Sequence, residues 1–483
     1  MHAPTSHIRR LVLLSAAGLA ACGTRSIADD FPPPVKVELQ GELGRGIQRT
    51  MRRLEESTPD HRNTVRVLFY GQSITEQAWS KAVEQELRKR YPNANLIVEN
   101  RAIGGFASNL LVMTSESDLY PFYPDLLIFY DYGRHDRYED MIRRTRERTT
   151  AEILLQTDHP CKAGDLDEET DPAKLNMGKW SSWFPNAFIP SIAEKYHAGM
   201  VQQRALWKLY AREQKIDPKN LLKDGVHLND HGNDLMAALV GAYLVRRPQF
   251  DDAGVTEQIR DYLPGKDFHW TGNTLRFPFA GNKIDLVVEP GSTGSCRVLI
   301  DGKKPSDLPE LYLTSRVSGY PGIGWPVICH VGNEKPLVLE DWTATATDFS
   351  PDGKQFKFSV EGSVTGKDGE GTADKRFVSN SGRAVIEPEA WNIAYSFGLI
   401  RSKGENDKSK PPFVPPDKIV ATWKVIPFFA DEFQSPPAAD PATETLVTLA
   451  QGLSNGPHEL QLIGKDGPVK IRAIRVYQPP LGR

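Results

Sequence analysis

The chain is poor in cysteine and in long hydrophobic runs. Its 483 residues include only four cysteines, too few for a scaffold held together by disulfides. After the first 21 residues, no stretch approaches the roughly 18 consecutive apolar residues that a membrane helix requires. Glycine-rich phosphate loops and coiled-coil heptads are also absent. What remains is the pattern of a globular chain, long enough for two or three domains.

An excess of charge of either sign is also missing. The 59 lysines and arginines nearly balance the 62 acidic residues, for a formal net charge of -3. This balance argues against nucleic acid as a partner, since nucleic-acid binding depends on clustered positive charge. The arginine-rich stretch Arg143–Arg148 is interpreted as a solvated helix face, and no motif calls for a cofactor.

The amino terminus carries an export pattern. A short basic region ends at Arg10, an apolar stretch too short to span a bilayer runs from Leu11 to Leu19, and Ala20-Ala21-Cys22 follows. The segment resembles a bacterial lipoprotein signal, which implies that Cys22 is lipidated after removal of residues 1–21. The alternative is an ordinary signal peptide with Cys22 incidental. Both predict export, and the first predicts a lipid anchor in the bacterial cell envelope, on its periplasmic or outer face.

The remaining sequence divides into four parts. Residues 22–59 are expected to form a tether and an N-terminal extension, with Pro32-Pro33-Pro34 in the tether. Strand and helix patterns alternate over 60–247, which predicts an α/β domain with a mainly parallel sheet. Residues 248–264 are a linker, and residues 265–483 read as an all-β sandwich.

Four strands are predicted within the α/β domain, at 65–70, 95–99, 125–130 and 151–156. Apolar residues from Trp79 to Leu87 recur at helical spacing. So do Ile192, Tyr196, Met200 and Leu206-Trp207, which predict one later helix, and a final helix is expected over 233–245.

Two motifs point to nucleophilic catalysis. Gly71-Gln72-Ser73 follows the first predicted strand, and Asp224-Gly-Val-His227 lies about 150 residues later. Serine needs an imidazole to accept its proton and a carboxylate to orient that imidazole. Ser73, His227 and Asp224 fit the three roles, and a spacing of three lets the last two project from one loop.

These motifs resemble the SGNH (GDSL-type) hydrolase family over residues 60–247. Gly71-Gln72-Ser73 resembles its first block, Gly105 is the glycine of the second, and Asp224-x-x-His227 matches the last. The third block departs, because His135 stands where the family has an asparagine in Gly133-Arg134-His135-Asp136. The resemblance implies a flavodoxin-like three-layer α/β/α fold. Gln72 in place of the commoner aspartate is similar to carbohydrate O-acetylesterase branches of the family.

The resemblance also implies an oxyanion hole. Its donors would be the backbone N–H groups of Ser73 and Gly105 plus one side chain. His135 is one candidate for the side chain and Gln72 is the other. Asp158 and His159 follow the fourth predicted strand, where they either shape a substrate pocket or only end the strand.

Two other features leave alternatives open. The long insertion 162–190 carries Trp180 and Trp183, which suit either sugar stacking or packing on the domain surface. His227 and His231 are four apart, a spacing used by zinc sites on helices. No glutamate follows the first histidine, so no metal is expected.

Period-2 alternation and turn signals mark the carboxyl part as β structure. Its closing segments, 453–462 and 469–477, resemble the last hairpin of a jelly-roll module of carbohydrate-active enzymes. The module either binds glycan or is a structural companion. Cys296 and Cys329 share this region and could pair, which would leave Cys161 unpaired.

The sequence therefore predicts a lipid-anchored serine esterase that removes small acyl groups, most simply acetyl, from a polysaccharide. A lipase or thioesterase acting on long chains, and a non-catalytic glycan-binding surface lipoprotein, are the alternatives. The oligomeric state is not indicated.

Overall fold

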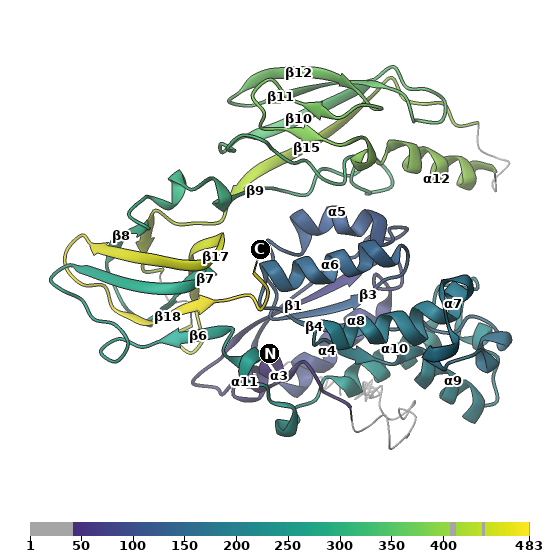
Figure 1. Cartoon of the computed structure of the whole chain (residues 1–483), viewed down its shortest axis with the longest axis horizontal. Coiled ribbons are helices and arrows are strands. Elements are labelled where there is room, and N and C mark those ends of the chain that lie inside the picture. Colours follow the sequence, from purple (N-terminus) through teal and green to yellow (C-terminus); the bar gives the residue numbers. More distant parts are fainter. Residues whose placement is uncertain (1–41, 406–411, 437–439, 483) are drawn as a thin grey trace, which may run out of the picture.

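The computed structural model describes residues 42–405, 412–436 and 440–482. The predicted signal, its Cys22 and most of the tether lie outside these residues. A parallel sheet covered by helices forms the centre of the molecule, and two antiparallel β modules lie against it (Figure 1).

The central sheet has the order β2-β1-β3-β4-β5, and all its strand pairs are parallel. The strands are β1 (Thr64–Gly71), β2 (Asn95–Asn100), β3 (Leu126–Tyr130), β4 (Glu152–Gln156) and β5 (Gly199–Val201). This is the flavodoxin-like order, in which ligands bind outside the carboxyl ends of the strands. The predicted α/β class and four of the five strands are confirmed, while the three-residue β5 was missed.

Helices cover both faces of this sheet because its strands are apolar on both sides. Val67 and Phe69 of β1 face one hydrophobic cluster, and Leu68 and Tyr70 face another. The first cluster is covered by α3 (Gln48–Glu55), α4 (Ala78–Arg90), α9 (Gln203–Glu213) and α10 (Asp230–Tyr243). The second is covered by α5 (Ser108–Asp118), α6 (His135–Arg148) and α8 (Ile189–Lys195). The predicted three-layer arrangement is therefore confirmed.

Two local predictions differ from the structure. The end of the N-terminal extension is helix α3, whose Met51 and Leu54 are buried in the domain core. The single helix expected from Ile192 to Trp207 is instead α8, β5 and α9. The chain leaves α8 through His197, whose φ of 50° is left-handed and ends a helix. Apolar spacing alone did not reveal this break.

The first β module is a six-stranded antiparallel sheet of order β16-β8-β17-β7-β18-β6. Its strands are β6 (Ile259–Tyr262), β7 (Thr274–Val288), β8 (Ser295–Ile300), β16 (Glu432–Gln434), β17 (Leu446–Gly464) and β18 (Ile471–Tyr477). Because β6 pairs with β18, part of the expected linker, after the short α11 (Ala253–Thr256), belongs to this module.

The second β module is inserted between β8 and β16. It contains a five-stranded antiparallel sheet of order β12-β11-β10-β15-β9. Its elements are β9 (Tyr312–Thr314), β10 (Asp341–Thr347), β11 (Lys357–Gly362), β12 (Gly366–Thr372), the pair β13 (Phe377–Val378) and β14 (Val385–Ile386), α12 (Ile393–Glu405) and β15 (Lys418–Pro427). The antiparallel β character of the carboxyl part is confirmed. The sequence grouped these strands into one sandwich, whereas the two sheets have separate hydrophobic clusters.

The cysteines lie in different surroundings. Cys296 is a free thiol in the cluster of the first β module, and Cys329 is a free thiol packed into the cluster beneath α5 and α6. The pairing considered for these two residues is therefore wrong, because membership of one sequence region did not place them in one core. Cys161 is also free. Within the described ranges, no helix is both long and apolar enough to cross a membrane.

Candidate active site

Ser73 lies directly past the carboxyl end of β1. Strand β1 ends at Gly71, where the backbone passes so close to β3 that a Cβ atom would lie 2.0 Å from the Tyr130 carbonyl oxygen. Its φ of 148° also favours glycine. The following turn is closed by a 2.8 Å hydrogen bond from the Thr75 N–H to the Gln72 carbonyl oxygen. The turn therefore presents Ser73 at the ligand-binding edge of the sheet.

Ser73, His227 and Asp224 meet through hydrogen bonds. The Ser73 Oγ and His227 Nε2 atoms are 2.9 Å apart, and His227 Nδ1 lies 2.9 Å from Asp224 Oδ2. Asp224 Oδ1 also accepts the backbone N–H groups of Val226 and His227, at 3.2 and 2.8 Å. This turn explains the spacing of three, because the carboxylate that accepts hydrogen bonds from the backbone also accepts one from the His227 ring. A proton on Nδ1 leaves Nε2 free to accept from the serine hydroxyl.

The Asp224 carboxylate remains ionised at neutral pH. The hydrogen bond from the His227 N–H lowers the pKa of Asp224 most. Burial opposes it, and the His227 ring and the Val226 N–H add to the lowering. The side chains of His227 and Asp224 are 33% and 51% exposed. The imidazole and its carboxylate thus lie at a surface open to solvent.

Two side chains hold the loop that carries His227. The Gln77 amide donates to the Leu228 carbonyl oxygen and accepts the Leu228 N–H, both at 3.0 Å. On the other side, His159 Nε2 donates to the Val226 carbonyl oxygen at 2.9 Å, and its Nδ1 accepts the Tyr130 hydroxyl at 3.0 Å. Gln77 was missed by the sequence reasoning. Its position four residues after Ser73 was the only available signal.

Two backbone N–H groups beside the serine are available as donors. Among the described residues, neither the Ser73 N–H nor the Gly105 N–H has a hydrogen-bond acceptor. The neighbouring Gly104 lies against the serine, since a Cβ placed on it would be 3.4 Å from the Ser73 Cβ. The Gly104 N–H donates to Glu76 Oε1 at 2.7 Å. The structure therefore brings the second motif next to the first.

The two candidates for a third donor differ in their surroundings. Gln72 is 4% exposed, and its Nε2 has no hydrogen-bond partner among the described residues. His135 begins helix α6, and its ring packs edge-on against Trp183 and Phe188, with centroid distances of 5.6 and 5.7 Å. Gln72 thus has a buried donor that is not used within the described residues, and which of the two residues supplies the third bond stays a prediction.

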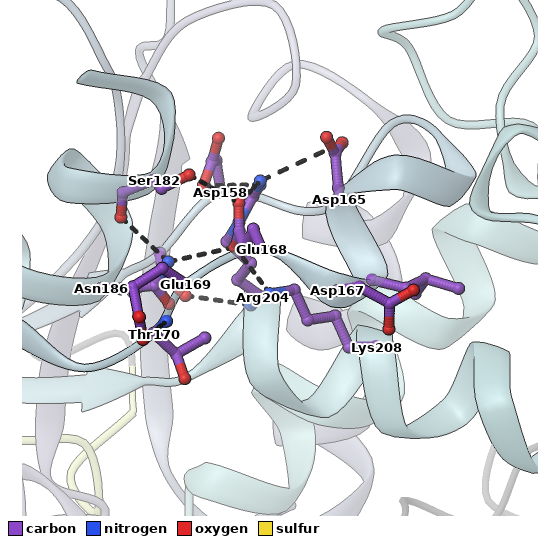
Figure 2. A network of polar contacts seen from close by, with 12 residues as sticks. Asp158, Asp165, Asp167, Glu168, Glu169, Thr170, Ser182, Asn186, Arg204 and Lys208 are labelled. Atoms are coloured by element: carbon purple, nitrogen blue, oxygen red, sulfur yellow. Dashed lines mark hydrogen bonds and ion pairs between the residues drawn. The ribbon is translucent and has the colours of Figure 1, made fainter. Parts of the chain in front are cut away.

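The insertion between β4 and α8 is held by a charged network (Figure 2). The Glu168 carboxylate, 9% exposed, accepts from Arg204 at 2.7 Å and from Lys208 at 2.6 Å, both on α9. Arg204 also lies 3.3 Å from Asp158 Oδ1. Burial raises the pKa of Asp158 to about 6, although Arg204 opposes it. Asp158 is thus part of this network, and a direct role in a substrate pocket stays a prediction.

The tryptophans of the insertion lie on the short helix α7 (Trp180–Trp183) and pack onto aromatic neighbours. Trp180 stacks on Phe184 with centroids 4.6 Å apart, and its ring edge meets Tyr132 at 6.5 Å. Trp183 stacks on Phe188 at 5.2 Å. Both tryptophan rings are therefore engaged in packing on the domain surface. Tyr132, which is 42% exposed, offers an accessible ring beside Trp180.

One buried acid at this edge was not predicted. Asp131 follows β3 directly, is 3% exposed, and neither carboxylate oxygen has a partner among the described residues. Burial raises the pKa of Asp131 well above its ordinary value. Its carboxyl group therefore takes up a proton at a higher pH than an exposed aspartate does, because burial without a partner disfavours the charged form.

The alternative metal site is not assembled. His227 precedes α10 and contacts Asp224 and Ser73, whereas His231 lies in its first turn, 2.7 Å from the Tyr210 hydroxyl. Across the part of the chain that is described, no group of three or more histidine, cysteine or acidic residues has a metal-binding arrangement.

No protein-family model matches the chain, and no curated protein matches it either. Among solved structures, it is similar to a two-domain esterase (CEX) active on acetylated mannans, with 10% identity over 92% of this chain and 100% of that one, at a TM-score of 0.34. A mutant of the acetylxylan esterase Axe2 from Geobacillus stearothermophilus matches with 16% identity over 39% and 97%, at 0.32. A putative GDSL-like lipase from Parabacteroides merdae matches with 17% identity over 39% and 100%, at 0.30. All three TM-scores are below 0.5, so the assignment of the fold rests on the strand order itself.

Proposed function

We propose that the protein is a serine esterase that removes small acyl groups, most simply acetyl, from a polysaccharide. The observation that carries the proposal is the 2.9 Å contact between Ser73 Oγ and His227 Nε2, with Asp224 on the other ring nitrogen. The backbone N–H groups of Ser73 and Gly105, which have no acceptor among the described residues, support it, since acyl transfer needs donors for an oxyanion.

The chemistry follows from this arrangement. Ser73 Oγ attacks the ester carbonyl carbon while His227 Nε2 takes the hydroxyl proton, and Asp224 stabilises the imidazolium. The N–H groups of Ser73 and Gly105 stabilise the carbonyl oxygen as it becomes negative. The sugar oxygen leaves with the proton from His227. Water then attacks the acyl-serine while His227 takes its proton. The bond to Ser73 Oγ breaks, His227 returns the proton to that oxygen, and the carboxylic acid is released.

The preference for carbohydrate rests on two features. Gln72 before the serine is the variant similar to carbohydrate O-acetylesterases, and the exposure of His227 and Asp224 suits a polymer chain lying across the site. A lipase or thioesterase needs room for a long apolar chain. Rates on nitrophenyl esters of increasing chain length separate these functions, because a steep fall beyond acetyl indicates deacetylation.

A serine label tests the proposal directly. A fluorophosphonate should modify Ser73, and Ser73→Ala should abolish labelling and lower kcat by at least roughly 10⁴-fold with the fold intact. Ser117→Ala is the matched control, because its hydroxyl only bonds within helix α5. Full activity of Ser73→Ala would remove the mechanism. A wild-type chain that is neither labelled nor active would favour the non-catalytic glycan-binding protein. Acetate release from acetylated xylan, pectin, sialoglycan and peptidoglycan would identify the polymer.

Export and lipid attachment at Cys22 belong to the same proposal. The basic and apolar segments before Leu19-Ala20-Ala21-Cys22 support them. Labelled palmitate should be incorporated into the full-length chain in bacteria, and Cys22→Ser should abolish the incorporation. An unlabelled wild-type chain that is still exported would indicate an ordinary signal peptide.

A further inference from the structure

The second β module reaches the loop that carries Gly105. The Tyr395 hydroxyl, on α12, donates a 3.1 Å hydrogen bond to the Gly105 carbonyl oxygen. The Trp325 ring fills the space beside the same residue, because a Cβ on Gly105 would lie 2.6 Å from Trp325 Cζ2. The φ of Gly105 is 83°, so both its backbone conformation and this contact require glycine.

Trp325 and Tyr395 act as one unit. Their rings stack with centroids 5.0 Å apart and an interplanar angle of 17°, and Trp325 also packs against the buried Phe106 at 5.8 Å. The two segments are tied by backbone hydrogen bonds, from the Cys329 N–H to the Ala390 carbonyl oxygen at 2.7 Å and from Asn392 to Val327 at 2.9 Å. The pair is therefore built into the module rather than carried on a free loop.

The module itself is fixed to the α/β domain close to this contact. The Arg316 guanidinium forms two hydrogen bonds of 2.7 Å with the Asp118 carboxylate at the end of α5, and Asp118 is 2% exposed. Cys329 packs into the cluster beneath α5 and α6, and Met113 of α5 packs against the cluster of the module. Figure 1 shows this module lying over α5, with α12 at its edge.

The peptide bond that carries the Gly105 N–H is held from both sides. Before it, the Gly104 N–H is bound to Glu76 at 2.7 Å. After it, the Gly105 carbonyl oxygen is bound to Tyr395, and the Phe106 N–H donates to the Ile103 carbonyl oxygen at 3.1 Å. Two consecutive glycines would otherwise rotate freely. The direction of the Gly105 N–H thus depends on a residue 290 positions away.

We infer that Trp325 and Tyr395 are positioning residues of the oxyanion hole, so that the second β module is part of the acyl-transfer site. The inference rests on the proposed esterase function. An oxyanion donor works only when it is already aimed at the developing charge. Loss of its support should therefore lower kcat while leaving KM and the thermal midpoint nearly unchanged.

The test compares matched substitutions, with nitrophenyl acetate as substrate. Tyr395→Phe, which loses only the hydroxyl, should lower kcat roughly three- to tenfold. Trp325→Ala should lower it by up to about 10²-fold, the scale of one lost donor. Trp325→Phe should restore part of the loss. Tyr312→Phe is the control for Tyr395→Phe, because it also removes one hydroxyl hydrogen bond, to the Ser306 carbonyl oxygen at 2.7 Å. Trp270→Ala is the control for Trp325→Ala, because it removes a half-buried tryptophan from the first β module. Both controls should keep wild-type kcat.

The outcomes separate the two proposals. A wild-type enzyme without esterase activity removes the proposed function itself. Wild-type activity with unchanged kcat in Tyr395→Phe and Trp325→Ala overturns only the positioning role. A rise in KM for the acetylated polysaccharide with unchanged kcat on nitrophenyl acetate also overturns it, because the rings would then bind substrate. A fall in kcat on both substrates with unchanged melting temperature supports the inference.

Discussion

The imidazole of His159 donates a hydrogen bond from Nε2 to the carbonyl oxygen of Val226, the residue directly before His227, over 2.9 Å. Burial lowers the pKa of His159 to about 4, so the ring is neutral at pH 5–8 and its Nδ1 accepts the Tyr130 hydroxyl. The end of β4 is thereby joined to the loop that carries the proposed base. The sequence placed His159 only near the rim of the sheet. The structure shows that its ring links β3 to the loop that carries His227.

His159→Phe should lower kcat roughly tenfold with little change in KM, because the His227 loop loses one of its two supports. Tyr130→Phe removes only the bond to Nδ1 and should have a smaller effect. Steady-state kinetics on nitrophenyl acetate, with melting temperatures measured in parallel, check this. A wild-type kcat in His159→Phe would show that Gln77 alone holds the loop.

Asp224→Asn should lower kcat by roughly 10³- to 10⁴-fold. An amide at this position can donate to His227 Nδ1, which moves the ring proton to Nε2 and prevents it from accepting the serine proton. Asp230→Asn, in the first turn of α10, is the control and should keep nearly full activity. More than a tenth of wild-type kcat in Asp224→Asn would contradict the assigned role.

Glu168 should make the folding stability of the protein decrease at low pH. Burial alone would raise its pKa, but hydrogen bonds from Arg204 and Lys208 outweigh burial and lower the pKa of Glu168 to about 2. The unfolded chain takes up the proton near 4.5, so this contribution is complete above pH 4.5 and is lost as the pH falls toward 2.

Glu168→Gln should therefore lower the melting temperature at pH 7, with a deficit that shrinks between pH 4.5 and 2. Glu169→Gln is the control, since Glu169 lies 3.8 Å from Lys174 and a glutamine keeps an oxygen for the Thr170 and Asp171 N–H groups. Thermal unfolding followed by circular dichroism gives both curves. Equal melting temperatures of wild type and Glu168→Gln at pH 7 would mean that the network does not stabilise the insertion.

The buried Asp131 should give folding stability the opposite dependence on pH. Its folded-state pKa is raised, so the folded protein holds a proton that the unfolded chain releases above about 3.8, and stability falls as the pH rises from there. Asp131→Asn should match wild type near pH 3 and become increasingly more stable toward pH 7. Asp136→Asn, which alters an exposed carboxylate paired with Arg134, should not show this trend. A destabilised Asp131→Asn at pH 7 would indicate that the ionised carboxylate has an unseen partner.

Much of the α/β domain could be predicted because its information is local. Short, largely apolar runs marked β1 to β4 within one residue at each end, and the glycine-serine turn after β1 marked the proposed nucleophile. The spacing of three between Asp224 and His227 allowed both side chains to project from one loop, and in the structure the carboxylate accepts from both the backbone and the ring. The short β5 was invisible, because three residues carry almost no periodic signal.

Other features depended on packing between distant segments. Alternation identifies a strand but not its partner, so the division of the β strands into two modules, and the separation of Cys296 from Cys329, could not be read from the chain. Gly105 was visible as a motif glycine, but its contacts with Trp325 and Tyr395 were not. Residues more than 200 positions apart meet only after hydrophobic burial has docked one module on another, and no local pattern records that docking.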